Sequence, residues 1–428
     1  MRQHLFHTHI NLGEDKNKMI KLRLKNLLIT FVSAIVFSSS AAMADGHVKY
    51  TVTSANVSEY AGMLNPGQMN MFAQYPDSYR IDVYEDSSAC ISDPDISAIS
   101  QANGTMVNDN EGIEVPNFGQ TPFPDPSQAQ HFVWNYRMSA GQISAIERVQ
   151  SSTNVKPDGS ITLGQQETSI SFPTNPRTKT MYADKNLFAL FMQKNLGPPR
   201  SAGTVTLVHD FIDSYMQPRK AWQYNPATRR VRRAPNISYD TLTTAGGGIV
   251  TVDQFGGFNG AQDRYDWSYE GMQKMIVPFA NDALAENTIA DTHTPFHLDP
   301  SYVRFEEKDV HIVHAQLRPG QRHLYESRTF YFIDGQPGLL IYQDMFDGNQ
   351  DLMRTYMQTH VKGGLGGSGM TSEDMCNVQG EYTFDFATRT YSGGNLMGPA
   401  IQPTSPIYNG EEKAVSFYTP DGLRRYAR

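Results

Sequence analysis

Short apolar segments separated by turn residues dominate the pattern of hydrophobic and polar positions along this chain. Their β-branched and aromatic content and their short length favour strands. We expect strands at Thr168–Pro173, Asp309–Leu317, Arg328–Ile333, Gly338–Phe346 and Gly380–Phe386. No repeat at a fixed short period is visible, which disfavours a repeat solenoid. The pattern therefore predicts a mainly β protein with few helices.

The stretch RTFYFIDGQPGLLIY, residues 328–342, predicts a β-hairpin because glycines at its centre permit positive φ. Alternation along the first strand places Phe330 and Phe332 on one face, with Tyr331 and Ile333 on the other. Apolar side chains on both faces mean that the sheet is covered twice here. One face packs on the core, and the other is covered by another sheet layer, by helices or by a bound apolar molecule.

Two segments have the pattern of short helices. In Asn65–Pro76, Asn65 is placed to cap a helix that begins at Pro66. The segment 183–199 has apolar residues at helical spacing before Gly197 and two prolines, and these residues are Leu187, Phe188, Leu190 and Phe191. We interpret both apolar stripes as core contacts.

The first 44 residues are a separate part of the chain. Lys21, Arg23 and Lys25 precede the apolar run 27–37, and small residues follow up to Ala44. This is the order of a secretory signal, and the run is too short for the roughly 20 residues that cross a bilayer. We predict a signal that starts near Met19 and is cleaved after Ala44. Residues 1–18 would be an upstream extension, and residues 45–428 a single β domain.

Charge and cysteine content narrow the function classes. The chain has 36 Lys and Arg against 44 Asp and Glu, and residues 45–428 have 30 against 42, a net formal charge of −12. This charge opposes attraction to phosphate backbones, so nucleic acid is not an expected partner. Cys90 and Cys376 are the only cysteines. In an oxidising compartment they are a disulfide candidate, with two separate buried thiols as the alternative.

A dense basic cluster, KAWQYNPATRRVRRAP (residues 220–235), stands out in this acidic chain. Asn225 to Thr228 suit a type I turn, so the flanks should pair as a hairpin. Pairing Tyr224 with Arg229 puts Trp222 opposite Val231 and Lys220 opposite Arg233 on one face. Arg230 and Arg232 then lie on the other face.

Two interpretations of these arginines stay open. On the aromatic face, Arg229 and Arg233 can lie against Tyr224 and Trp222 with a cation–π gain of about 0.5–2 kcal/mol each. The first interpretation is a solvated hairpin whose arginines pair with acids such as Asp240, Asp263 and Asp266. The second is a rim that meets an anionic head group or a membrane surface.

The sequence displays no catalytic motif, so we expect a protein that is not an enzyme and needs no metal or cofactor. His311 and His314 would face opposite sides of a strand, and no HExxH helix is present. The serine of GGSGM, residues 366–370, lacks the GxSxG pattern of a nucleophile elbow. An envelope hydrolase would need a nucleophile and base that the sequence does not show.

The block AWQYNPATRRVRRAPNISYDT followed by FNGAQDRYDW (residues 258–267) resembles the hallmark of a Gram-negative family catalogued as domain of unknown function 1329. Supporting segments at 54–84, 122–137, 328–334 and 344–354 extend the resemblance over nearly the whole mature chain. Two departures, EDSSAC after Tyr84 and Met353 in place of a tryptophan, put local contacts in doubt.

The resemblance implies a fold similar to the lipoprotein carrier and receptor of the Lol system. That fold is a large curved antiparallel sheet, an incomplete barrel around helices, with an apolar cavity. It also implies envelope transport beside a resistance-nodulation-division type exporter and an outer-membrane β-barrel protein. Burial of ten methylenes at about 0.8 kcal/mol each would hold a cargo with about micromolar affinity.

We therefore expect a soluble periplasmic carrier or chaperone for a lipid or another hydrophobic molecule. The alternative is a docking subunit of an exporter or outer-membrane barrel that carries no cargo. The residues expected to bind are an aromatic wall and an anion-binding group, namely Trp222, Tyr224, Tyr265 and Trp267, and Arg229, Arg230, Arg232 and Arg233.

Overall fold

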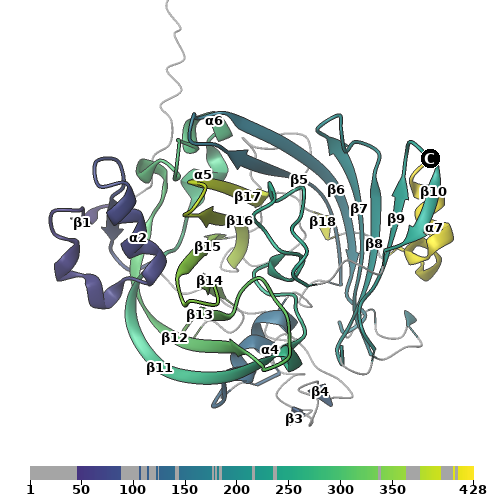
Figure 1. Cartoon of the computed structure of the whole chain (residues 1–428), viewed down its shortest axis with the longest axis horizontal. Helices are drawn as coiled ribbons and strands as arrows, with labels where there is room; N and C mark the ends of the chain where they lie inside the picture. Colours follow the sequence, from purple (N-terminus) through teal and green to yellow (C-terminus); the bar gives the residue numbers. More distant parts are fainter. Residues whose placement is uncertain are drawn as a thin grey trace, which may run out of the picture. The chain divides into compact units, whose positions relative to one another are not determined.

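The computed structural model describes most of the chain after residue 45 (Figure 1). The described residues are 46–87, 106–107, 113–114, 122–123, 125–139, 144–175, 178, 181–182, 186–214, 217–234, 239–335, 339–362, 376–396, 408–409 and 413–428. Ala42–Arg428 form one compact unit. The signal, its cleavage site and Cys90 lie outside the described residues, so the predicted processing and the predicted disulfide with Cys376 stay predictions.

Strands are more common than helices among the described residues. The α-helices are α2 (Pro66–Gln74), α4 (Ala129–Ser139), α5 (Asp282–Glu286), α6 (Ile289–Thr292) and α7 (Pro420–Tyr426). The strands are β1 (Val48–Val52), β2 (Ile81–Tyr84), β3 (Met106–Val107), β4 (Ile113–Glu114), β5 (Ala145–Val155), β6 (Ile161–Ser171), β7 (Leu187–Gly197), β8 (Val205–Phe211), β9 (Lys220–Asn225), β10 (Arg230–Arg233), β11 (Tyr265–Pro278), β12 (Phe305–Leu317), β13 (Ser327–Ile333), β14 (Leu340–Phe346), β15 (Leu352–Lys362), β16 (Cys376–Asp385), β17 (Thr390–Leu396) and β18 (Tyr408–Asn409). No helix among these is long and apolar enough to cross a bilayer.

One sheet contains 16 of these strands, and its main path runs β1-β2-β12-β13-β14-β15-β16-β17-β5-β6-β7-β8-β9-β10. Its ladders are antiparallel apart from a short parallel contact between β2 and β12, and β11 pairs with β12. The sheet bends strongly and its two ends do not pair with each other (Figure 1). The predicted fold class, a mainly β protein with a large curved antiparallel sheet, is confirmed.

The inner face of the sheet, defined here as the face that packs on α4, has two apolar clusters. Phe132, Val133 and Tyr136 of α4 pack with Phe330 and Phe332 of β13. On its other side, α4 contributes Trp134 and Met138 to a cluster that contains residues of β7 and the end of β6, including Phe188 and Phe172. α4 therefore fills the space between the two halves of the bent sheet.

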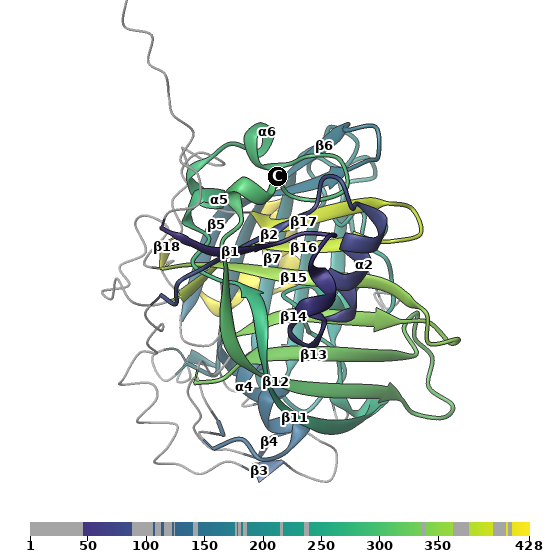
Figure 2. The same cartoon turned by 90° about the vertical axis from the view of Figure 1, so that its left-hand side faces the viewer.

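The outer face is covered by different helices. α2 lies across the strands around β14 and β15 (Figure 2), and its Met71 and Phe72 share a cluster with Tyr331 and Ile333. At the far end of the sheet, α7 covers β8, β9 and β10. The predicted division of Phe330 and Phe332 from Tyr331 and Ile333 is confirmed, and in the described structure helices cover both faces.

All five strands predicted from the hydrophobic pattern are present in the structure. The five predicted strands overlap β6, β12, β13, β14 and β16. The helix after Asn65 is also confirmed, with Pro66 in its first turn. The Asn65 side chain accepts from the backbone of Gln68, whose side chain accepts in turn from Asn65, so a capping box begins the helix.

The helix predicted over residues 183–199 is wrong, because Leu187–Gly197 form strand β7. β7 pairs with β6 on one side and β8 on the other. Leu190 and Met192 face the α7 cluster, whereas Phe191 contacts Phe255 at 5.9 Å. A strand that is apolar on both faces has a short continuous apolar run, and such a run also fits helical spacing.

Asp344 of β14 links α2 to the sheet. Its fully buried carboxylate accepts from Asn65 Nδ2 at 3.0 Å, Tyr331 Oη at 3.0 Å and Thr355 Oγ1 at 2.7 Å. Burial raises the pKa of Asp344 to about 6 from 3.8, against the lowering effect of these hydrogen bonds. The carboxyl thus holds its proton more tightly in the folded than in the unfolded chain.

Asp344 should therefore make the protein less stable as pH rises. The contribution of its raised pKa to the free energy of unfolding is complete below about pH 4 and is lost as pH rises through about 6, by about 3 kcal/mol. Asp344→Asn should remove this dependence, and the exposed-site control Asp77→Asn should keep it. Urea unfolding of wild type, Asp344→Asn and Asp77→Asn between about pH 4 and pH 8 measures how the free energy of unfolding depends on pH. Parallel profiles for wild type and Asp344→Asn would contradict the assignment.

Candidate functional site

The predicted arginine hairpin is present as β9 and β10, with a different register. Asn225 pairs with Arg230, Tyr224 with Val231, and Trp222 with Arg233, a shift of two residues from the predicted pairing. Asn225 Oδ1 accepts from the backbone of Ala227 and Thr228, as a turn here requires. Arg229 then takes a left-handed conformation with φ 54° and joins the loop instead of pairing with Tyr224.

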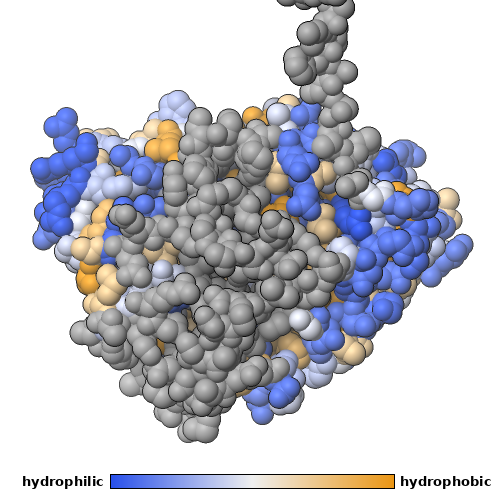
Figure 3. All heavy atoms as spheres, turned by 180° about the vertical axis from the view of Figure 1, so that it is seen from behind, coloured by the Kyte–Doolittle hydropathy of each residue, from blue (hydrophilic) through white to orange (hydrophobic). Residues whose placement is uncertain are grey.

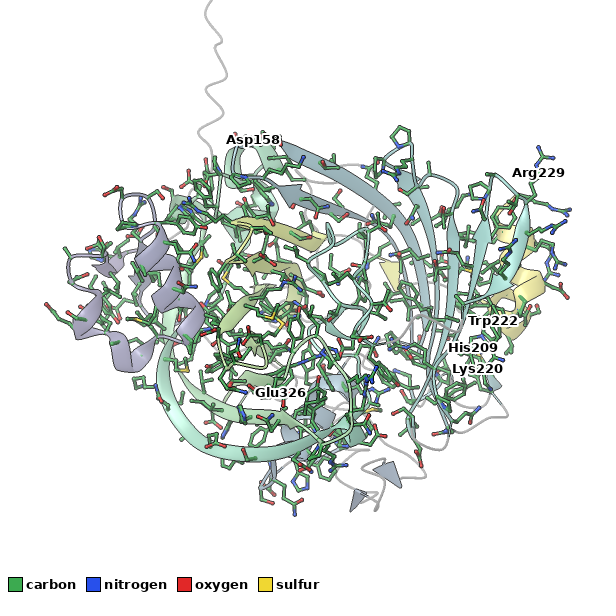
Figure 4. All side chains as sticks on the ribbon, viewed as in Figure 1. Asp158, His209, Lys220, Trp222, Arg229 and Glu326 are labelled. Atoms are coloured by element: carbon green, nitrogen blue, oxygen red, sulfur yellow. The ribbon has the colours of Figure 1, made fainter. Side chains whose placement is uncertain are left out.

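Despite the shift in register, arginines of β10 lie on both faces of the hairpin, as predicted. Arg233 shares the outer face with Trp222, and Arg232 lies beside Gln223 on the inner face. Arg229 points away from the sheet at the hairpin tip (Figure 4). All four arginines are exposed, and with the described residues they form no ion pair or cation–π contact. Within the described residues Asp266 pairs with Arg318 and not with a hairpin arginine, and Arg318 also binds the backbone oxygen of Asp263.

Trp222 and Tyr224 belong to the core beneath α7. Tyr224 is buried in a cluster with Tyr418 and Leu423, and half-buried Trp222 packs on its edge. The Trp222 and His209 rings meet edge to face at 4.9 Å, and the two side chains lie on the same side of the molecule (Figure 4). Both predicted aromatic residues thus help to hold the C-terminal helix on the hairpin.

Tyr265 and Trp267 lie on β11, which pairs with β12 and not with the hairpin. The structure therefore places the four predicted aromatic residues in two pairs at different parts of the sheet, and they do not form one wall. Trp267 contacts Phe258 at 5.6 Å, Phe330 at 5.5 Å and Tyr265 at 5.9 Å. The Trp267 indole nitrogen donates to the backbone oxygen of Gln262 at 2.8 Å. We call Phe258, Tyr265, Trp267, Phe330 and Phe332 the inner aromatic surface.

The helix α4 covers the Phe332 end of this surface. Phe132 stacks between Tyr269 at 5.1 Å and Phe332 at 6.1 Å, and Tyr136 lies 6.1 Å from Phe332. Tyr136 also donates a hydrogen bond to the backbone oxygen of Gly256. Removal of this 11-residue helix would thus uncover Phe332, which stacks on Phe330 at 6.3 Å.

A glycine-rich segment, residues 239–262, lies beside α4 and is held mainly by polar bonds to the sheet. Gln254 Nε2 donates to Thr383 at 2.7 Å, and the Gly256 amide donates to Glu381 at 3.1 Å. Gly257 has φ 82°, and a Cβ there would lie 2.7 Å from the Leu340 side chain. This close approach requires glycine.

A buried ion pair anchors the segment. Arg328 Nη2 donates to Asp253 Oδ2 at 2.7 Å, and His323 Nε2 lies 3.2 Å from the same oxygen. The Arg328 guanidinium also lies over the rings of Tyr265 and Tyr325, at 5.2 and 5.0 Å. Burial alone would raise the pKa of Asp253, but Arg328 and His323 lower it well below its ordinary value. The carboxylate therefore stays charged in the core.

Two cavities of the described structure are too small or too polar to accommodate an acyl chain. A cavity of about 30 Å³ beneath α2 is lined by residues that include Met71, Tyr342 and Met357, and it has room for only about two water molecules. A second cavity of about 240 Å³ is polar, with Lys274, Glu307 and other charged residues in its wall.

The histidines do not gather into a metal site in the described structure. No group of three metal-ligating side chains occurs there. His311 contacts Asp334 and Tyr269, whereas His314 contacts Thr329 on the other face of β12, as predicted.

Sequence reasoning missed three features of this region. It did not identify α4, although FVWNY has the aromatic content of a core helix. It did not pair Asp253 with Arg328, because 75 residues separate them and no local pattern links them. It also overlooked the arginines of the C-terminal GLRRYAR, which packing brings next to the hairpin.

Comparison with known proteins gives a family and distant structural likenesses. The family model described as "Protein of unknown function (DUF1329)" matches residues 51–424. A Pseudomonas aeruginosa protein described as "Uncharacterized protein PA3922" is 34% identical over 311 residues, which cover 71% of this chain and 68% of that protein.

Solved structures are similar over part of the chain. A DUF1329 family protein from Desulfovibrio piger has 12% identity and a TM-score of 0.44, covering 66% of this chain and 92% of that one. The LolA superfamily protein NE2245 from Nitrosomonas europaea has 10% identity and a TM-score of 0.41, covering 69% of this chain and 100% of that one.

The buried pair Asp253–Arg328 should dominate the stability of this region. Asp253→Ala leaves Arg328 buried and uncompensated, so it should lower the free energy of unfolding by about 3–5 kcal/mol. The double variant Asp253→Leu with Arg328→Met should recover much of this loss, because it removes both charges. The exposed control Asp77→Ala should change stability by less than about 0.5 kcal/mol. Urea unfolding measures all three, and an equal loss in single and double variants would contradict the pairing.

Proposed function

Because the chain belongs to the DUF1329 family, whose signature covers residues 51–424, we propose a function that rests on the inner face of its sheet. The protein is a periplasmic carrier or chaperone for a lipid or another hydrophobic molecule, and it performs no catalysis. It acts beside an envelope exporter, of the resistance-nodulation-division type, and an outer-membrane β-barrel protein. The predicted signal before Ala44 supports this location.

One observation carries the proposal: the helix α4 packs on a sheet face whose strands β11 and β13 carry the aromatic side chains Tyr265, Trp267, Phe330 and Phe332. Cargo would bind this inner aromatic surface when α4 moves aside. The apolar residues that α4 buries, Phe132, Val133 and Tyr136, mark the area that the cargo would take over.

The energetics suit a reversible exchange. Cargo binding replaces contacts of α4 with contacts of the cargo, so the net gain is smaller than the full transfer of an acyl chain from water. Ten buried methylenes contribute about 8 kcal/mol before these costs. The resulting affinity allows release to a partner, which a shuttle requires.

The glycine-rich segment would set one border of the cargo site. Gln254, Gly256 and Asp253 bond to polar groups of β13 and β16 that an acyl chain could not satisfy. Displacement of the segment would leave these buried polar groups without hydrogen-bond partners, at a free-energy cost of about 1–3 kcal/mol each. We therefore place the cargo under α4 and not under this segment.

A second candidate function is a docking subunit that carries nothing. The small size of the cavity beneath α2 and the packed inner face favour it. The four exposed arginines of the hairpin would then bind an acidic surface of the exporter or barrel.

The two candidates differ in what the purified protein contains. Native mass spectrometry with lipid extraction, on protein purified gently from the periplasm of its own host, should reveal a stoichiometric adduct of lipid mass. Addition of envelope lipids to stripped protein should restore this adduct. A clean ligand-free mass that persists after such addition would contradict the carrier and favour the docking subunit.

A further inference from the structure

A second basic cluster lies beside the arginine hairpin. The C-terminal helix α7 and the residues after it carry Arg424, Arg425 and Arg428, all exposed. α7 contacts β8, β9 and β10, and Figure 1 shows the C-terminus next to β10. Two segments almost 200 residues apart in the sequence thus form one surface. We call the four hairpin arginines and these three the arginine end.

Packing explains why the arginines of α7 point outward. Thr419 caps the helix by accepting from the Gly422 amide, and Leu423 is fully buried in the cluster that contains Tyr224. Tyr426 packs on the same cluster, so the helix has one buried side. The arginines occupy the remaining side, on the same part of the molecule as the hairpin.

Most of this positive charge is not neutralised within the described structure. Arg424 pairs with Asp421 at 2.9 Å, but both side chains are largely exposed, at 49% and 73%. Arg425 binds the backbone oxygen of Ser416. The hairpin arginines form no ion pair with the described residues. Positive charge is thus concentrated at one end of a chain whose residues 45–428 have a net formal charge of −12.

We propose that the arginine end docks the protein on an anionic phospholipid surface. This inference does not depend on whether the protein carries cargo. Guanidinium groups bind phosphate oxygens through two parallel N–H donors, and arginines near an anionic leaflet add to membrane affinity. A surface that combines two separate segments can spread its arginines over several head groups.

The charge distribution also selects a flat membrane over a long nucleic acid. A membrane touches the arginine end alone, and salt screens the acidic remainder beyond about 8–10 Å. A nucleic acid wrapped along the chain would meet the acidic surface as well.

Apolar groups at this end suit the boundary between head groups and acyl chains. Val415, in the 3-10 helix η8 (Val415–Tyr418) before α7, and Leu196 of β7 are each 43% exposed. η8 contacts β7 and α7. In Figure 3 this end lies at the left, where hydrophilic spheres border hydrophobic ones. Arginines beside exposed apolar side chains are typical of proteins that bind membrane interfaces.

Co-sedimentation of the full chain with vesicles tests the proposal. The vesicles are phosphatidylcholine, with or without about one third phosphatidylglycerol, at about 0.05 M and about 0.2 M salt. The protein should bind the anionic vesicles only, and less at high salt. Arg230→Gln with Arg232→Gln should weaken partitioning about 30-fold, since each arginine contributes about five-fold. Arg424→Gln with Arg425→Gln should weaken it by a similar factor.

A matched control removes two exposed charges elsewhere. The double variant Lys156→Gln with Arg322→Gln should bind vesicles as wild type does. The turn that contains Lys156 lies away from the arginine end, because its Asp158 is well separated from Arg229 (Figure 4). Circular dichroism should show that all three variants fold. Equal binding to neutral and anionic vesicles, or no binding to either, would overturn the proposal. A loss confined to the hairpin variant would exclude α7 from the surface. Binding to soluble polyglutamate but not to vesicles would assign the surface to an acidic protein.

Discussion

The need to cover both faces of one antiparallel sheet is the constraint on which the rest of this structure depends. β13 carries Phe330 and Phe332 on its inner face and Tyr331 and Ile333 on its outer face, and all four are buried. A sheet with apolar residues on both faces cannot leave either face in water. α2 and α7 therefore cover the outer face, and the bend of the sheet encloses α4 on the inner one.

The two covers of the inner face differ in chemistry, and the proposed function follows from this difference. The glycine-rich segment is held by buried hydrogen bonds and by the Asp253–Arg328 pair, which are costly to break. α4 packs on the sheet through apolar and aromatic contacts, which a lipid chain can replace in kind, and Tyr136 and Arg137 add hydrogen bonds to the backbone oxygens of Gly256 and Phe211. A carrier needs one fixed wall and one exchangeable wall, and these two elements fit those roles.

Local patterns predicted the strands, the capping of α2 and the opposite faces of β13, because alternation and capping depend on neighbouring residues. The same reasoning was wrong for β7, whose apolar residues on both faces fit helical spacing. It also missed by two residues the register of the hairpin, since the left-handed Arg229 lengthens the loop.

What the sequence could not provide is contact between distant segments. The separation of Trp222 and Tyr224 from Tyr265 and Trp267 depends on strand order, which no local pattern encodes. The joining of the hairpin with α7 is of the same kind. The four aromatic residues that were expected to form one wall therefore lie in two places. Trp222 and Tyr224 lie beneath α7, and Tyr265 and Trp267 lie on the inner aromatic surface.

The most direct test of the central claim, that cargo binds the inner aromatic surface, is quenching of tryptophan fluorescence by dibromostearic acid. Bromine quenches an indole that it contacts, and Trp267 belongs to this surface while Trp222 lies beneath α7. The acid should quench wild type, Trp222→Phe and Trp134→Phe to similar extents, because Trp134 of α4 packs away from this surface, and Trp267→Phe should lose most of the effect. Saturable quenching that persists in Trp267→Phe, or no saturable quenching in wild type, would contradict a cargo site under α4.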